Sequence, residues 1–162
     1  MRAALRDARA AAEADEVPVG CVVVHDGLVI GRGHNQTVTL QDATAHAEIV
    51  AIGAASTALG SWRLLDCTMY VTLEPCAMCA GAIILARVPR LVYGAFDPKA
   101  GACGSVLDVI HEPRLNHRVD VTNGVLAEEC GELLRAFFAK KRQRGNGDAA
   151  GSGGPVGSDG SA

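Results

Sequence analysis

The chain has 162 residues, the size of one domain that can bury a hydrophobic core without disulfide bonds. Hydrophobic residues make up 49% of it, yet no apolar run approaches the roughly 18 residues typical of a transmembrane helix. The formal net charge of −3 argues against a strongly basic nucleic-acid-binding protein. The composition therefore predicts a soluble protein that makes no use of a membrane.

The composition also divides the chain into a folded part and a tail. The stretch 145–162, GNGDAAGSGGPVGSDGSA, is rich in Gly and Ser and cannot bury apolar surface. We therefore expect one domain over 1–144 and a disordered tail over 145–162. Two of the 18 acidic residues, Asp148 and Asp159, lie in this tail, which leaves the folded part nearly neutral. Five basic residues crowd together near its end: Arg135, Lys140, Lys141, Arg142 and Arg144.

Six cysteines are spread along the chain: Cys21, Cys67, Cys76, Cys79, Cys103 and Cys130. The N-terminus favours an amphipathic helix and does not resemble a secretory signal peptide. In such a chain, cysteines are expected as thiols or metal ligands, not as disulfides. We therefore expect a cytoplasmic protein.

The predicted elements alternate between helix and strand after an initial hairpin. Residues 1–14 are rich in Ala, Leu and Arg, which favours a helix. Two β-rich runs over 16–35 then flank Asp26-Gly27, the pattern of a β-hairpin. The following elements are a helix over 45–59 capped by Thr44, a strand over 68–73, a helix over 75–87 opened by Pro75, a strand over 90–95, a strand over 118–122 and a helix over 127–144. This order predicts a three-layer α/β/α sandwich around a mixed five-stranded sheet.

Cys76 and Cys79 lie at the start of a predicted helix, where unpaired backbone N–H groups and the helix dipole favour thiolates. A C-x-x-C pair also occurs as core cysteines, as a redox pair or as half of a structural zinc site. The order of elements is not that of a thioredoxin, and the chain has no second such pair. His46, at the start of another predicted helix, supplies a third ligand and leaves a fourth position for water, as in catalytic zinc sites. The soft thiolates favour zinc.

Glu48 follows His46 by two residues, about 200° around a helix, so both can reach an ion only beyond the helix N-terminus. Two thiolates and one imidazole bring the formal charge of zinc to about zero, which makes it a weaker acidifier of water and calls for a nearby base. Glu48 is placed to be that base. An acid in a first helical turn can also simply stabilise the helix dipole.

The H-x-E and P-C-x-x-C patterns together are those of nucleobase deaminases. The stretch 17–142 resembles the bacterial tRNA-specific adenosine deaminase family, block by block and in order: EVPVGCVVV, TAHAEIVAI, YVTLEPCAMCAGAI, GAFDPKAGACGS and NHRV. Cytidine, cytosine, guanine and riboflavin-pathway deaminases share the zinc pattern, but the additional blocks are more discriminating. The resemblance implies a cytidine deaminase-like fold, one zinc ion per subunit held by His46, Cys76 and Cys79, and a homodimer.

The resemblance also implies a reaction and a partner. The reaction is hydrolytic deamination of the wobble adenosine of a tRNA anticodon to inosine, with a zinc-activated water as nucleophile and Glu48 moving the protons. The partner is the tRNA anticodon stem-loop. Asn35 is implied to hydrogen-bond the target nucleoside, although Asn is also an ordinary turn residue.

Four residues are implied as further substrate contacts. Asp97 and Lys99 lie in the loop that lines the anticodon channel in the family, and Phe138 and Arg142 lie in FFAKKRQR, whose aromatic and cationic side chains suit unpaired bases and phosphates. Alternatively, the loop residues form a solvated turn, and Phe137 packs with Phe138 in the core. We expect at least one of the two Phe residues to be buried. His34, Ala43 and Cys103 depart from the family pattern, so the resemblance does not define the shape of the substrate channel.

Two other functions are compatible with parts of the pattern. A free nucleobase or nucleoside deaminase, acting on guanine or cytosine, would need a closed pocket without the basic C-terminal helix. A nucleic-acid-binding module with structural zinc would tolerate replacement of Glu48.

Overall fold

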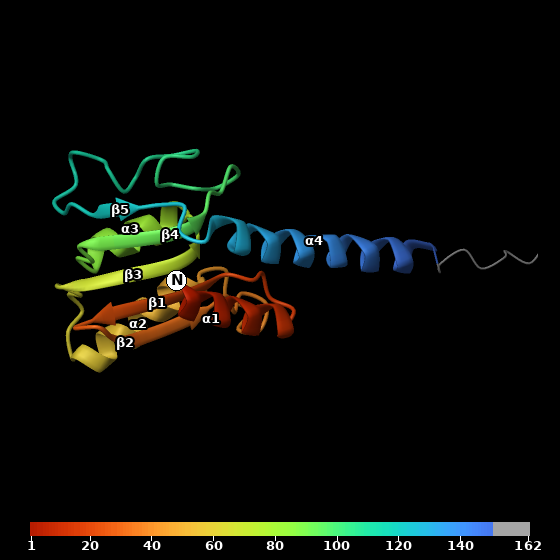
Figure 1. Ribbon diagram of the computed structural model, residues 1–162, viewed down its shortest axis with the longest axis horizontal. Helices are drawn as coiled ribbons and strands as arrows, with labels where there is room; N and C mark the ends of the chain where they lie inside the picture. The colour runs from red at the N-terminus through yellow and green to blue at the C-terminus, as the bar shows by residue number, and fades with distance from the viewer. Residues whose placement is uncertain (151–162) are drawn as a thin grey trace, which may run out of the picture.

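In the computed structural model, residues 1–150 are described, with side chains through residue 144. The elements in chain order are α1 (Arg2–Glu13), β1 (Gly20–His25), β2 (Leu28–His34), α2 (Ala47–Leu59), β3 (Cys67–Leu73), α3 (Ala77–Leu85), β4 (Arg90–Ala95), β5 (Asp120–Thr122) and α4 (Ala127–Ala150) (Figure 1). This order confirms the predicted succession. Helix α4 continues to Ala150, into the stretch that was predicted as tail, and the rest of that predicted tail, 151–162, lies outside the described residues.

Within residues 1–150, the five strands form one mixed sheet in the order β2-β1-β3-β4-β5. β1 runs antiparallel to β2 and to β3, whereas β3, β4 and β5 are parallel. Asp26 and Gly27 connect β1 to β2 with φ values of 47° and 76°. Positive φ at both positions is what a tight two-residue hairpin turn requires, so the hairpin predicted from Asp26-Gly27 is confirmed.

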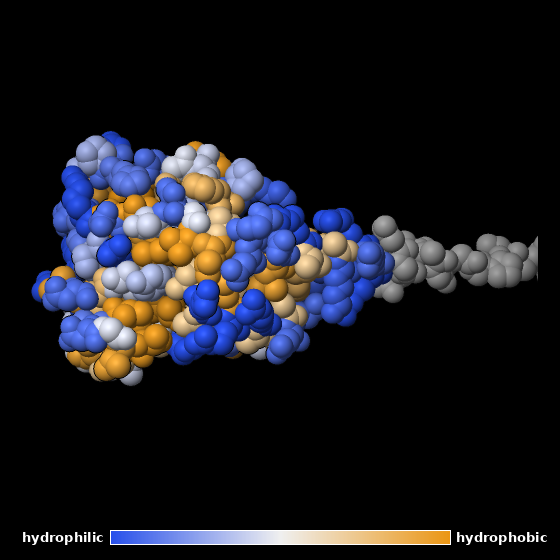
Figure 2. Space-filling view, in the orientation of Figure 1, coloured by the Kyte–Doolittle hydropathy of each residue, from blue (hydrophilic) through white to orange (hydrophobic). Residues whose placement is uncertain are grey.

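Helices cover both faces of the sheet. α2 and α3 lie behind the strands in Figure 1, and α1 and α4 lie on the other face. The main hydrophobic core fills the space between the sheet and the α2/α3 layer, and a smaller cluster around Leu5, Ala95 and Cys130 fills the other interface. Figure 2, seen from the α1 and α4 side, shows hydrophilic side chains along the outer part of α4. The predicted three-layer sandwich is thus the observed architecture.

Small residues bring α2 unusually close to the sheet. The buried face of α2 includes Ala47, Ala51 and Ala55, spaced four residues apart along the helix. They pack on Gly31 and Gly33 of β2, where an added Cβ would lie 2.5 Å from the Ala51 carbonyl oxygen and 2.7 Å from the Ala51 nitrogen, respectively. Because neither strand position has room for a side chain, the path of α2 and of the residues at its N-terminus is fixed.

The starts of two helices differ from the prediction. α2 begins at Ala47 with His46 as N-cap, not after Thr44, whose hydroxyl donates to Asp42 Oδ1 at 2.7 Å. α3 begins at Ala77 with Cys76 as N-cap, so Pro75 precedes the helix. Both helices thus start two residues later than predicted. None of the helices in the described residues is both long and apolar enough to cross a membrane.

Candidate active site

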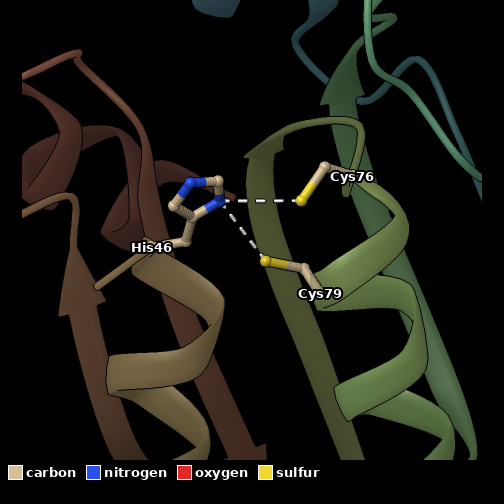
Figure 3. Close-up of side chains that lie close together, drawn as sticks. All are labelled: His46, Cys76 and Cys79. Atoms are coloured by element: carbon tan, nitrogen blue, oxygen red, sulfur yellow. Dashed lines mark hydrogen bonds between the residues drawn. The ribbon is translucent and has the colours of Figure 1, made fainter. Parts of the chain in front are cut away.

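His46, Cys76 and Cys79 converge on one point between the N-termini of α2 and α3 (Figure 3). The Nδ1 atom of His46 lies 3.6 Å from Cys76 Sγ and 3.5 Å from Cys79 Sγ. All three candidate ligand atoms lie within 4.8 Å of one another. The structure therefore brings together the three residues that the sequence predicted as metal ligands.

The spacing of these atoms fits zinc. With Zn–S bonds of about 2.3 Å, a Zn–N bond of about 2.05 Å and tetrahedral angles, a sulfur and a nitrogen ligand lie about 3.6 Å apart. The observed separations of 3.5 and 3.6 Å match that value. Within the described residues, no fourth His, Cys, Asp or Glu joins the cluster. Three protein ligands with one position open is the arrangement of catalytic zinc sites, whereas structural sites are closed by four.

The two thiols differ in their electrostatic environment. Hydrogen bonds from the Cys79 thiol and from His46 lower the pKa of Cys76 to about 3. The pKa of Cys79 is raised, first by its hydrogen bond to Cys76 and then by burial. The bond to Cys76 also raises the pKa of His46. Cys76 is thus the thiol that loses its proton more readily, and metal binding would displace the remaining protons of the cluster.

Glu48 lies in the first turn of α2, with only 4% of its surface exposed. Burial raises the pKa of Glu48 to about 7, partly offset by the nearby His46. A carboxyl group that titrates near neutral pH can both accept and return a proton, which is what a general base that also acts as an acid requires. Glu48 thus lies buried in the wall of the cavity, beside the cluster of metal ligands.

A cavity of about 260 Å³ opens above the cluster. Its wall includes His46, Cys76, Glu48 and Asn35. The side-chain oxygen of Asn35 accepts a hydrogen bond from the Ala47 N–H at 3.0 Å and so caps α2 from the end of β2. Asn35 is therefore a buried wall residue and not a solvated turn residue. Its second role, as a helix cap, was missed because the two partners are 12 residues apart.

A larger groove of about 740 Å³ adjoins this cavity, and the two share Val17, Leu73 and Asp97. The other residues predicted as substrate contacts, Lys99, Phe138 and Arg142, all line the groove. Phe96 and Arg135, which were not predicted, line it as well.

The two aromatic residues of FFAKKRQR have different environments. Phe137 is 8% exposed and Phe138 is 43% exposed. The expectation that at least one of them is buried is confirmed. The ring of Phe138 lines the groove and packs edge-on against the ring of Phe137, with 5.4 Å between the ring centroids, while Phe137 itself is buried.

Two buried carboxylates that were not predicted support the loops around the cavity, and the first of them is Glu16. It accepts hydrogen bonds from the Thr39 and Val38 N–H groups at 2.6 and 3.2 Å and from the Thr37 hydroxyl at 3.3 Å. Burial alone would raise the pKa of Glu16, but these donors outweigh it and lower the pKa. Glu16 therefore remains an anion that fixes the loop between β2 and α2.

The second buried carboxylate, Glu74, lines the cavity itself. Burial alone would raise the pKa of Glu74. Hydrogen bonds from the loop after β4, the strongest from the Ser105 hydroxyl, outweigh burial and lower the pKa of Glu74 below its ordinary value. Each of the two loops that border the cavity is thus hydrogen-bonded to its own buried carboxylate, Glu16 or Glu74.

The fold and the site define a class of protein. A sheet with helices on both faces, two helix N-termini that hold one imidazole and two thiolates, and a buried Glu beside them are the features of a zinc-dependent nucleobase deaminase. The MafB19-like deaminase family matches residues 1–142. The chain belongs to this family, among its tRNA-specific adenosine deaminases.

Individual relatives support that placement. The tRNA-specific adenosine deaminase of Bacillus subtilis (strain 168) is 50% identical over 144 residues, 89% of this chain and 89% of the relative. That of Agrobacterium fabrum (strain C58 / ATCC 33970) is 52% identical over 142 residues, 88% and 93% of the two chains. A solved structure from a study of A-to-I editing by tRNA:A34 deaminases at the wobble position of transfer RNA is 51% identical, with a TM-score of 0.80, over 83% of this chain and 97% of that one.

Guanine deaminases are more distant relatives of the same fold. The structure of guanine deaminase from Nitrosomonas europaea is 30% identical with a TM-score of 0.74, over 85% of this chain and 82% of that one. The predicted deaminase fold is therefore confirmed.

Proposed function

We infer that this chain deaminates the wobble adenosine of a tRNA anticodon to inosine by hydrolysis. The observation that carries this inference is a small cavity, with a metal triad and a buried Glu48, that opens onto a groove lined by Lys99, Arg135, Arg142 and exposed aromatic rings. A free base needs only the cavity, whereas a base presented by an RNA loop also needs the groove. Identity of about half to tRNA-specific adenosine deaminases over most of both chains points to the same substrate.

His46, Cys76 and Cys79 would hold the zinc ion, through the imidazole Nδ1 and the two sulfurs. When bound, zinc lowers the pKa of a water molecule and so supplies the nucleophile for C6 of adenine. The protein holds the imidazole and the thiolates in place by making His46 and Cys76 the N-caps of α2 and α3. The ligand geometry is therefore set by the start of two helices.

Glu48 would carry the protons of the reaction. It takes a proton from the attacking water and delivers it to ring N1, which makes C6 more electrophilic. It then transfers a proton from the added oxygen to the amino group, so that the C6–N bond breaks and ammonia leaves. Adenosine and water thus give inosine and ammonia, with Glu48 unchanged. Burial, which brings the pKa of Glu48 to about 7, suits both directions of transfer.

Asn35 would orient the base. Its oxygen already accepts the Ala47 N–H, so its amide NH₂ group is the part available to an acceptor atom of the nucleoside. Because Asn35 is 7% exposed and tied to α2, it would hold the base in a fixed relation to Glu48.

The groove would hold the rest of the anticodon loop. Lys99 and Arg142 lie where they can contact phosphates, and the half-exposed ring of Phe138 can stack on an unpaired base. Asp97 uses Oδ1 to accept the Lys99 and Ala100 N–H groups at 2.9 and 3.2 Å, so it shapes the turn that presents Lys99. Local cations at this groove offset the overall net charge of −3.

We also propose that the protein is a homodimer that pairs through the outer face of α2 and α3. Between them these helices contain one charged residue, Glu48, and it is buried. Met78 and Leu85 on α3 are 37% and 70% exposed. An outer helical layer without charge is typical of a surface that a second copy covers. A tRNA substrate and six free cysteines are also what we expect of a cytoplasmic enzyme.

The test compares four substrates with the zinc-loaded protein. These are an anticodon stem-loop with adenosine at the wobble position, the same stem-loop with adenosine one position away, free adenosine and free guanine. We expect inosine from the first substrate alone, read by mass spectrometry. Xanthine from guanine, or inosine from free adenosine at a comparable rate, would support the free-base reading in place of ours. Binding of the stem-loop without any turnover would support a binding module.

A further inference from the structure

A single buried carboxylate ties the substrate loop to the segment that carries a metal ligand. Glu74 is 2% exposed and follows β3 directly. Its Oε1 accepts the N–H groups of Cys103 and Ser105 at 3.0 and 3.1 Å. Its Oε2 accepts the Asp97 N–H at 3.0 Å and the Ser105 hydroxyl. Four donors from both ends of the loop 97–105 therefore converge on this one side chain.

The loop is wrapped closely around that carboxylate. A Cβ added at Gly101 would lie 2.5 Å from Glu74 Oε2, so only glycine lets the loop backbone pass. The Gly101 N–H donates to the Asp97 carbonyl at 3.0 Å, which closes the first part of the loop. The Gly101 carbonyl accepts the N–H groups of Val106 and Leu107, both at 3.0 Å. Besides Ala102 and Cys103, which pack in the main core, the loop is held by its hydrogen bonds to Glu74.

Glu74 links residues that line the substrate groove to a residue of the metal cluster. Asp97 lines both the cavity and the groove, and Lys99 lines the groove. On the other side, Glu74 is joined through Pro75 to Cys76, and the Pro75 carbonyl accepts the Ala102 N–H at 2.8 Å. Glu74 therefore sits between the residues that we assign to RNA and the residue that we assign to zinc.

We propose that Glu74 is a positioning residue that sets the place of Asp97 and Lys99 relative to the metal site. By fixing these two residues, Glu74 sets the affinity of the protein for the RNA loop. The proposal rests on the proposed function, because the readout is deamination of an RNA. A carboxylate suits this position because three of the four groups facing it are backbone N–H groups, which can only donate, whereas the Ser105 hydroxyl can also accept. A Gln at this position would turn its NH₂ group toward at least one of those N–H groups and lose that hydrogen bond.

The experiment compares Glu74→Gln and Ser105→Ala with a matched control, Glu112→Gln. Glu112 is also a carboxylate that accepts a backbone N–H, from Arg114 at 3.0 Å, but it lines neither the cavity nor the groove. Ser105→Ala removes a single donor and serves as a mild variant should Glu74→Gln fold poorly. Each variant is measured for zinc content, for hydrogen exchange of peptides covering 97–105, and for kcat and KM on the wobble-adenosine stem-loop.

We expect Glu74→Gln to bind one zinc ion, to exchange amide hydrogens over 97–105 about tenfold faster, and to raise KM about tenfold with kcat within about threefold of wild type. Ser105→Ala should shift the same quantities in the same direction by less, and Glu112→Gln should shift none. A lower apparent kcat at unchanged KM, or unchanged exchange over 97–105, would overturn the proposal, because a merely structural role reduces the folded fraction alone. Failure of the proposed function is distinct, since the wild type itself would then give no inosine.

Discussion

Replacing Gly33 with Ala should weaken zinc binding, although Gly33 is not one of the zinc ligands. A Cβ at this position of β2 would lie 2.7 Å from the Ala51 nitrogen and closer still to the Ala47 carbonyl oxygen. Ordinary contacts begin at 3.4 Å, and the Ala47 carbonyl oxygen would lie only 2.2 Å away, so restoring an ordinary contact there would require α2 to move away from the sheet by about 1.2 Å. Because both contacting atoms are backbone, no side chain can give way instead.

The movement would reach the ligands directly, since His46 precedes Ala47 at the start of α2. A displacement of about 1.2 Å is several times the tolerance that zinc sites allow, about 0.2 Å on each bond. We expect Gly33→Ala to lower the free energy of unfolding by about 1–3 kcal/mol. We also expect zinc affinity to fall by at least about tenfold, measured by competition with a chelator, and the gain in Tm on adding zinc to shrink accordingly.

Gly131→Ala in α4 is the matched control. There, an added Cβ would meet only the guanidinium of Arg135, at 3.0 Å, which can swing away. The same substitution in a helix should stabilise the protein by about 0.5–1 kcal/mol and leave zinc affinity unchanged. If Gly33→Ala bound zinc as tightly as the wild type, the close packing of α2 on β2 would not be what fixes His46, and the reasoning would be refuted.

Other parts of the account lead to further expectations. Glu16→Gln should cost about 2 kcal/mol of unfolding free energy at pH 7. Because the folded pKa of Glu16 lies below its ordinary value of 4.5, this difference should shrink as pH falls below that value, and denaturant titrations at several pH values would contradict us if it stayed constant. Phe138→Ala should weaken stem-loop binding by about 1–3 kcal/mol without loss of Tm, whereas Phe137→Ala should lower Tm; equal effects on Tm would count against their different burial. Arg142→Gln should reduce the slope of log affinity against log salt by about one unit, and an unchanged slope would remove this residue from the phosphate contacts. Leu85→Glu should convert the dimer into a monomer by sedimentation analysis, and a persistent dimer would place the interface elsewhere.

The parts of the site that could be predicted are those with short sequence spacing. His46 and Glu48 are two residues apart, Cys76 and Cys79 are three apart, and each pair begins a helix, so local rules were enough to predict a metal site. The hairpin was equally local, because Asp26 and Gly27 by themselves indicate a tight turn.

The parts that could not be predicted depend on partners far apart in the chain. Asn35 caps α2 from 12 residues away, and this bond replaces the local cap expected from Thr44. Glu16 and Glu74 bind loops that lie 21 to 23 and 23 to 31 residues further along, respectively. Nothing in the spacing of a lone Glu indicates which backbone donors will surround it, because that depends on how the strands place the loops.

The central claim is that Glu48 performs proton transfer beside a zinc ion to convert adenosine to inosine. The most direct test is Glu48→Gln in the full chain, loaded with zinc and incubated with the stem-loop carrying adenosine at the wobble position. We expect one zinc ion per chain, unchanged stem-loop binding and inosine formation slower by about 10³-fold. Inosine formation at the wild-type rate with zinc retained would contradict the account, because Glu48 would then have no part in the chemistry.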